Sequence, residues 1–370
     1  MMKKLSLFVI LVISATFSFA QNLTTPPDGG NKKATVGERI GITDVNIHYD
    51  RPAVKGREGR IWGALVPYGF TDQGFGTSKS APWRAGANEN TTISFSTDVQ
   101  VEGKHLPAGT YALFIALTET DATIIFSKNS TSWGSFFYNE KEDALRVTVK
   151  PVKLANSVER LSYFFFNEKE NSAVVSLQWE KLEIPFTISV DLVNTQLESM
   201  RRELRSEIGF KWESYVEAIN FCLANNVNLE EALQWSDYAI NAVFVGQKNF
   251  RTLSAKAGVL RKLNKIAESE SLMKEAVPLA SMQELHNYGK QLIREKRMAD
   301  ALAAFKLNAQ KNPGVFTTNM GLARGYSATG DFKNAQKYAK LALPQAPDKQ
   351  NVDAITNYLL MLGEGKDINN

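Results

Sequence analysis

Hydrophobic and polar residues alternate along the first half of the chain, which is typical of β-strands with one buried face. The alternation is clearest in two series. The apolar members of the first are Tyr111, Leu113, Ile115 and Leu117, and those of the second are Ile184, Phe186, Ile188, Val190 and Leu192. Gly, Pro, Asn and Asp separate such segments and no helical pattern intervenes. The pattern therefore predicts an antiparallel β-sandwich over residues 36–193. Because proline lacks a backbone N–H, we expect Pro185 at an edge or a bulge.

The hydrophobic period changes near Thr195. Apolar residues then recur at helical spacing, first at Leu197, Met200, Leu204 and Ile208. Charges of both signs are mixed between them, which indicates a solvated helix face. No convincing strand pattern follows as far as Leu362. The sequence thus predicts an all-β domain followed by an all-α domain over residues 196–363.

An internal repeat appears in the second half. Residues recur 34 positions apart, where Ala301, Phe305 and Pro313 correspond to Ala335, Ala339 and Pro347. Small residues at helix contacts and a closing proline resemble the tetratricopeptide repeat, a helix-pair unit of that length. We expect Gly289 at a tight helix crossing and Gly330-Asp331 in an inter-helix turn. Stacked repeats bind proteins or peptides on one face, so the resemblance implies such a partner here.

The N-terminal residues resemble a secretory signal peptide. Lys3 and Lys4 precede an apolar run over 5–19, and Ser18 and Ala20 are small residues before a cleavage site. The run is shorter than the roughly 20 apolar residues that a membrane span needs. We predict a signal peptide over 1–20 cleaved after Ala20, a flexible leader over 21–35, and a periplasmic or secreted mature protein without a transmembrane segment.

Composition excludes several classes of function. The 370 residues carry a formal net charge of +4, which is too small for a nucleic-acid-binding protein, and no dense Lys/Arg block appears. Cys222 is the only cysteine, so no intramolecular disulfide can form. Its neighbours Phe221 and Leu223 lie in a helical pattern, which predicts a buried thiol.

Sequence signatures of cofactor and metal sites are missing. The histidines His48, His105 and His286 do not form an H-x-x-H or H-E-x-x-H spacing. No G-x-S-x-G, Walker or G-x-G-x-x-G motif occurs. The sequence therefore predicts neither a metal nor a cofactor. We expect His48 on a strand facing water, His105 in a turn and His286 in a repeat helix.

The stretch 83–92 holds the densest polar cluster, and a strand pattern follows it directly. Trp83 offers a flat apolar face, Arg84 and Asn88 offer directed donors, and Glu89 offers a carboxylate. A cluster of these residue types next to a strand is typical of a site that recognises a polar ligand.

A second polar cluster runs from Tyr49 to Arg57. Arg51 and Lys55 flank the turn made by Pro52 and Gly56, and Trp62 follows in an apolar run. One interpretation is a solvated basic loop, with Trp62 filling the core. The alternative places Arg51 or Lys55 beside Glu89, as an ion pair or as one wall of a pocket.

Three roles remain open for the first cluster. Arg84 could pair with Glu89 and hold the turn, which would make the cluster structural. The cluster could instead bind a ligand. Catalysis would use Glu89 as a general base and Arg84 as a charge stabiliser, as in a hydrolase that acts on envelope polymers.

Residues 36–191 resemble a family of exported bacterial β-domains of unknown function, seen mostly in Bacteroidetes. The matching blocks are Tyr49-x-Arg51-Pro52, Lys55-Gly56-Arg57, Ile61-Trp62-Gly63-x-Leu65-Val66-Pro67-Tyr68-Gly69, Trp83-Arg84-x-Gly86-Ala87-Asn88-Glu89, Leu106-x-Ala108-Gly109-Thr110-Tyr111, Ile124-Ile125-Phe126, Trp133-Gly134 and Leu145-Arg146-Val147. This sequence departs from the family by an insertion over 71–82, beside the candidate site. The resemblance implies a fold and a compartment but no activity.

These observations together predict an exported binding or scaffold protein rather than an enzyme. The helical repeats would hold a protein or peptide partner. The β-domain would carry a pocket for a small polar ligand, formed by Arg51, Lys55, Trp83, Arg84, Asn88 and Glu89. The competing hypothesis is the hydrolase in which Glu89 is the general base.

Overall fold

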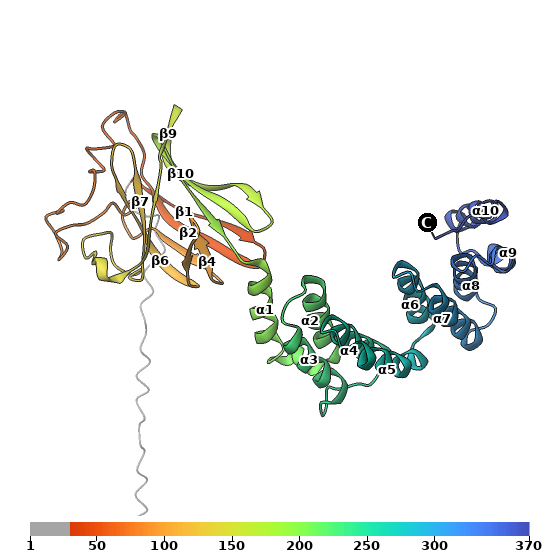
Figure 1. Ribbon diagram of the computed structural model, residues 1–370. Helices are drawn as coiled ribbons and strands as arrows, with labels where there is room; N and C mark the ends of the chain where they lie inside the picture. The colour runs from red at the N-terminus through yellow and green to blue at the C-terminus, as the bar shows by residue number, and fades with distance from the viewer. Residues whose placement is uncertain (1–29, 370) are drawn as a thin grey trace, which may run out of the picture. The chain divides into compact units, whose positions relative to one another are not determined.

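The computed structural model describes residues 30–369 (Figure 1). The predicted signal peptide and most of the predicted leader lie outside these residues. The chain divides into two compact units between Leu192 and Val193. The first consists of antiparallel sheets and the second is helical, as the change of hydrophobic period predicted.

The first unit, here called the β-domain, contains two antiparallel sheets. The larger has the strand order β1 (Lys32–Ile40), β2 (Thr43–Arg51), β3 (Thr92–Phe95), β6 (Gly109–Leu117), β7 (Ala122–Ser127) and β8 (Asp143–Val149). The smaller has the order β5 (Lys104–Leu106), β4 (Val99–Val101), β10 (Ser172–Ser189) and β9 (Val152–Lys169). Every described pairing between these strands is antiparallel.

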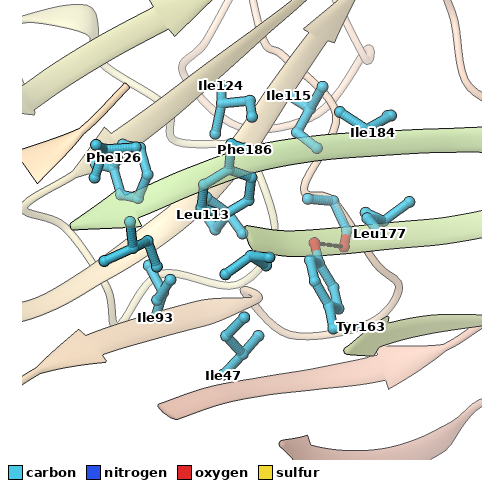
Figure 2. Packing of buried hydrophobic residues seen from close by; sticks show 14 of the residues in the cluster. Ile47, Ile93, Leu113, Ile115, Ile124, Phe126, Tyr163, Leu177, Ile184 and Phe186 are labelled. Atoms are coloured by element: carbon cyan, nitrogen blue, oxygen red, sulfur yellow. Dashed lines mark hydrogen bonds between the residues drawn. The ribbon is translucent and has the colours of Figure 1, made fainter. Parts of the chain in front are cut away.

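Alternation of side chains produces one core between the two sheets. In β2, Val45 and Ile47 are fully buried while Asp44 and His48 are exposed. Figure 2 shows side chains of both sheets facing one another in this core, among them Ile47, Ile93 and Leu113 from the larger sheet and Tyr163, Leu177 and Phe186 from the smaller. Burial of this apolar surface stabilises the domain, which has no disulfide.

Pro185 lies where it interrupts no described strand pairing. Strand β10 pairs with β9 as far as Glu183, and with β4 from Ile188 onward. Pro185 falls between these two stretches, so its missing N–H costs no bond of either ladder.

The structure corrects the predicted leader. Strand β1 begins at Lys32, inside the segment 21–35 that we expected to be flexible. Lys32 pairs with Arg51 and Lys33 with Asp50. Since β1 is an edge strand, its backbone bonds to β2 hold it in place while its polar side chains stay in water.

Among residues 193–369 the structure contains helices and turns but no strand, which confirms that prediction. The α-helices are α1 (Leu192–Glu203), α2 (Trp212–Asn225), α3 (Leu229–Asn241), α4 (Phe250–Lys262), α5 (Ile266–Ala276), α6 (Met282–Arg294), α7 (Met298–Lys311), α8 (Phe316–Ala328), α9 (Phe332–Ala342) and α10 (Lys349–Gly363). Consecutive helices pack on one another from α2 to α5 and again from α6 to α10. None of the helices within residues 30–369 has the length and apolarity that a membrane span requires.

Small residues allow close helix contacts, as the repeat pattern predicted. A Cβ atom added to Gly289 in α6 would lie 2.5 Å from ring carbons of Phe305 in α7. One added to Gly321 in α8 would lie 2.6 Å from the same ring. Phe305 is fully buried between these helices, and the equivalent residue of the next repeat, Ala339, is fully buried too. Only glycine lets the backbones of α6 and α8 approach this ring so closely.

Candidate functional site

The stretch 83–92 enters the β-domain through a short pairing with β6. The Trp83 N–H donates to Ile115 O at 3.0 Å, and the Ile115 N–H donates to Trp83 O at 2.8 Å. At the far end the Leu113 N–H donates to Thr91 O at 2.8 Å. Between these anchors the chain leaves the sheet as a turn over 84–90, so the turn is fixed at both ends by one central strand.

Backbone conformation and local bonds hold the turn. Ala85 has φ +48° and Asn88 has φ +55°, which are left-handed values that cost free energy outside glycine. Arg84 Nη1 donates to Asn88 O at 2.6 Å, and Tyr163 Oη donates to Ala85 O at 2.8 Å. Gly86 is needed because an added Cβ would lie 2.5 Å from Thr91 Oγ1. These contacts offset the free-energy cost of the left-handed backbone conformations and make the turn a rigid element.

A pocket of about 480 Å³ opens beside this turn. Here it is called the β-domain pocket. Its described lining consists of Asn31, Pro52, Arg57, Leu65, Val66, Pro67, Gly69, Thr71, Gln73, Ala81, Pro82, Trp83, Arg84, Gly86, Ala87, Asn88, Ser135 and Trp179. The segment 71–82 forms one wall, and Gln73 Nε2 fixes it by donating to Ser135 Oγ at 2.8 Å.

Tryptophans form the apolar floor of the pocket. The rings of Trp83 and Trp179 are stacked with centroids 6.2 Å apart and an interplanar angle of 21°. Trp62 meets both rings edge-on, at 5.6 Å from Trp83 and 5.7 Å from Trp179. Trp179 is almost fully buried, whereas Trp83 is half-buried. The cluster therefore packs into the core of the β-domain, and the half-buried Trp83 presents aromatic surface to the pocket.

Arg84 lies in the pocket wall and lacks an ionic partner among the described residues. Its guanidinium carbon lies 4.8 Å from the centroid of the Phe136 ring, a cation–π contact. A Cβ on Gly134 would collide with the guanidinium, so the glycine makes room for it. Burial lowers the pKa of Arg84 from its ordinary value, and no nearby carboxylate opposes that shift.

Arg57 is the second cation of the lining. Its Nε donates to Val54 O at 2.9 Å and its Nη2 donates to Ala53 O at 2.6 Å. These bonds hold the guanidinium against its own loop and leave Nη1 outside them. The described lining of the pocket contains two arginines and no Asp, Glu or His.

The structure brings together half of the residues that we predicted for the site. Trp83, Arg84 and Asn88 line the pocket. Arg51 instead ties β2 to β9, because its Nε donates to Leu161 O at 2.8 Å and its Nη2 to Ser162 Oγ at 2.6 Å. Lys55 is exposed in a turn with φ +50°.

Glu89 also lies outside the lining, and its predicted pairing is wrong. It accepts from Lys33 Nζ at 2.8 Å, and both side chains are about half exposed, at 55% for Lys33 and 50% for Glu89. Glu89 therefore pairs with the edge strand β1, not with Arg84, Arg51 or Lys55. A general base must lie within hydrogen-bond reach of a substrate, and Glu89 lies outside the pocket that would hold one.

Sequence reasoning missed most of the other wall residues. Arg57 belongs to the second polar cluster but was not placed at the site. Gln73, Ser135 and Trp179 come from distant segments and carry no local signal. Among residues 30–369, no group of three or more His, Cys, Asp or Glu side chains is arranged to hold a metal ion.

The helical unit carries a separate groove of about 500 Å³ along α2, α4 and α6. Here it is called the helical groove. It crosses the first helices of successive helix pairs, and α2 also contacts α4 directly. Polar side chains along it include Asn220, Ser254 and Asn287, and apolar ones include Val216, Phe250 and Tyr288. A groove lined by residues of several helix pairs suits a segment of another chain.

Charge in the helical groove is predominantly positive. Arg251, Arg261 and Arg294 line it, and none has an ion pair among the described residues, whereas Arg297 pairs with Asp300 at 2.7 Å. Arg251 lies over the Trp212 ring at 5.0 Å. Both lining carboxylates already accept hydrogen bonds. Glu284 accepts one from the Ser281 N–H at 2.8 Å, and Glu295 accepts one from Gln291 at 2.7 Å.

Comparison with known proteins gives two kinds of match. No curated protein matches the chain. A crystal structure of YrrB, described as a TPR protein with an unusual peptide-binding site, is 18% identical with a TM-score of 0.29, and the match covers 45% of this chain and 84% of that one. MamA MSR-1 C2 is 13% identical with a TM-score of 0.26, and the match covers 42% of this chain and 95% of that one. The sheet domain is thus followed by a helical region with a tetratricopeptide protein among its structural neighbours, and residues 31–188 match the family described as "Protein of unknown function (DUF2911)".

Proposed function

We propose that the protein is an exported, non-enzymatic binding protein that holds a segment of a partner protein in the helical groove. The observation that carries this proposal is the continuous groove across α2, α4 and α6, with side chains of several repeats exposed along it. A partner segment in this groove would contact several helices at once. Many weak contacts would then together give specific binding.

The positive charge of the helical groove indicates the composition of the partner segment. Arg251, Arg261 and Arg294 supply three positive charges without carboxylate partners in the described structure. An acidic segment would complement them, increase the rate of encounter and disfavour basic segments. The partner is therefore an extended segment with several Asp or Glu residues.

The β-domain pocket is the second binding site of the proposed function, and it takes a small polar ligand. Trp83, Arg84 and Asn88 supply an aromatic surface and directed donors to it. No observation favours the hydrolase alternative, because Glu89 pairs with Lys33 outside the pocket.

Export completes the proposal and rests on the N-terminal sequence alone. Lys3 and Lys4, the apolar run and the small residues before Gln21 support secretion. Fractionation and N-terminal sequencing of the expressed mature protein test it. A mature chain that begins at Gln21 outside the cytoplasm supports export, and a chain that keeps residues 1–20 in the cytoplasm contradicts it.

Selection of displayed peptides on the full chain tests partner binding. We expect enrichment of peptides with several Asp or Glu residues, and salt should weaken their binding. Arg251→Glu combined with Arg294→Glu should abolish the enrichment. The control is Lys333→Glu combined with Lys340→Glu on α9, which changes the net charge equally and should keep it. Enrichment of uncharged peptides, or the same peptides with the groove variant, contradicts the proposal.

A further inference from the structure

We propose that the β-domain pocket is a site for a small organic anion, whose carboxylate or phosphate binds Arg84 while its ring packs on the tryptophan floor. This inference rests on the proposed function, in which the pocket takes a small polar ligand, and it names the chemical class of that ligand.

The first argument is uncompensated positive charge. Arg57 and Arg84 both line the pocket, and its described lining holds no carboxylate. The nearby Glu89 is already paired with Lys33 at 2.8 Å. A charge removed from water without a counter-ion costs free energy, and burial accordingly lowers the pKa of Arg84. A bound anion would supply the missing charge inside the pocket.

The second argument is the donor geometry. Arg84 Nη1 is committed to Asn88 O at 2.6 Å, and the described bonds leave its Nε and Nη2 uncommitted. A guanidinium offers donors in a planar fork that matches a carboxylate or a phosphate. Phe136 at 4.8 Å and Gly134 fix the plane of this fork. Less side-chain entropy is therefore lost on binding than for a free arginine.

The third argument is the size and character of the cavity. A volume of about 480 Å³ lies within the roughly 300–1,000 Å³ that small-molecule sites occupy. Stacked Trp83 and Trp179, together with Val66 and Pro82, give the pocket apolar surface beside the arginines. A free inorganic ion would leave this surface in water. An anion attached to a ring would cover it, which favours an organic anion.

Isothermal titration of the full chain with matched probes tests the proposal. Glucose, glucuronate and glucose 6-phosphate share one ring and differ in charge, and benzoate carries the charge on an aromatic ring. We expect glucuronate, glucose 6-phosphate or benzoate to bind at least about tenfold more tightly than glucose, and added salt should weaken that binding. The two charged sugars separate a carboxylate ligand from a phosphate ligand.

A pair of variants at the rim links binding to this pocket. Leu65 lines the pocket and is 48% exposed, so its substitution should leave the fold intact. Leu65→Asp places a negative charge at the rim and should weaken anion binding by about tenfold or more. Leu65→Asn has nearly the same shape without the charge and should change it by less than about threefold. Arg84→Lys keeps the charge but loses the fork, and should also weaken binding.

Three results would overturn the inference. If glucose binds as tightly as glucuronate and glucose 6-phosphate, the inference of an anion site is wrong, but the proposal that the pocket binds a small polar ligand is retained. Equal binding by Leu65→Asp and Leu65→Asn would place the anion elsewhere. No heat with any of the four probes at millimolar concentration would also overturn it, whereas peptide selection on the same protein would still test the helical groove.

Discussion

Lys33 Nζ lies 2.8 Å from Glu89 Oε2, so that an ion pair joins the edge strand β1 to the turn beside the β-domain pocket. Both side chains are about half exposed, at 55% for Lys33 and 50% for Glu89. Exposed ion pairs contribute roughly 0–1 kcal/mol because water and salt screen them. The pair positions the start of β1 without adding much to stability.

We therefore predict that Glu89→Gln changes the free energy of unfolding by less than about 1 kcal/mol and leaves ligand binding in the pocket intact. Thermal melting and titration of the full chain measure the two effects. Lys33→Gln should give the same result, because it removes the same pair. If Glu89→Gln abolished binding or a turnover, the hydrolase alternative would regain support.

Arg84 should matter far more to stability than Glu89. It closes the turn through its bond to Asn88 O and packs on Phe136. A hydrogen bond from a charged group contributes roughly 1.5–3 kcal/mol, so Arg84→Ala should destabilise the β-domain by about 2–3 kcal/mol. Differential scanning calorimetry measures the loss. Arg60→Ala is the control, since its exposed guanidinium makes one long bond of 3.2 Å, and an equal loss there would contradict the role of Arg84.

Hydrophobic period was sufficient to predict sheets followed by helices, because burial of every second residue specifies a strand and burial of every third or fourth residue specifies a helix. The first residues of β1 were missed by this method, since the burial of this strand is shallow and Lys32, Lys33 and Thr35 are exposed. What holds an edge strand is backbone pairing to its neighbour, and that pairing leaves little trace in the pattern of side chains.

Only part of the candidate site was predicted, because a sequence pattern reports which residues are close along the chain and not which segments pack together. Trp83, Arg84 and Asn88 lie in one turn, so their proximity could be inferred from sequence. Trp179 reaches the same pocket from β10 through the packing of the two sheets, which no local pattern specifies. Glu89 is adjacent to Asn88 in sequence but points to Lys33, because the turn directs successive side chains differently.

Gly289 tests the repeat packing. Its Cβ in Gly289→Ala would lie 2.5 Å from Phe305 ring carbons in a fully buried position, so α6 and α7 must separate. Overpacking of this kind costs roughly 1–3 kcal/mol, and we expect a lower melting temperature for the helical unit. Circular dichroism at 222 nm, a helix signal, follows that transition.

The matched control is Gly363→Ala at the end of α10, where the new Cβ would lie 3.9 Å from Gln336 Nε2, an ordinary van der Waals contact. Alanine is there a better helix former by roughly 0.5–1 kcal/mol, so this variant should melt at the same temperature or higher. A Gly289→Ala variant as stable as this control would show that the crossing tolerates a methyl group.

His286 makes the stability of the helical unit depend on pH. Its side chain packs 5.7 Å from the Phe305 ring, and its Nδ1 is buried without a hydrogen-bond partner among the described residues. Burial, together with the charges of Lys290 and Arg324, lowers the pKa of His286 from 6.5 to about 4.

The direction of the pH effect follows from proton uptake. Between about pH 6.5 and 4 the unfolded chain binds a proton at His286 and the folded chain does not. Acid therefore favours unfolding: the stability is complete above pH 6.5, falls as the pH drops through this window and levels off below pH 4. At pH 5 the loss is roughly 2 kcal/mol, since one pKa unit corresponds to about 1.4 kcal/mol.

We predict that His286→Gln removes this dependence, because glutamine does not titrate. Urea unfolding of the helical unit at pH 7.5 and 5 should show the loss for the original chain and a smaller one for the variant. His48→Gln is the control, since His48 is exposed on β2 in the other unit and should leave the pH profile of the helical transition unchanged. Parallel profiles for the original chain and His286→Gln would mean that other groups cause the acid sensitivity.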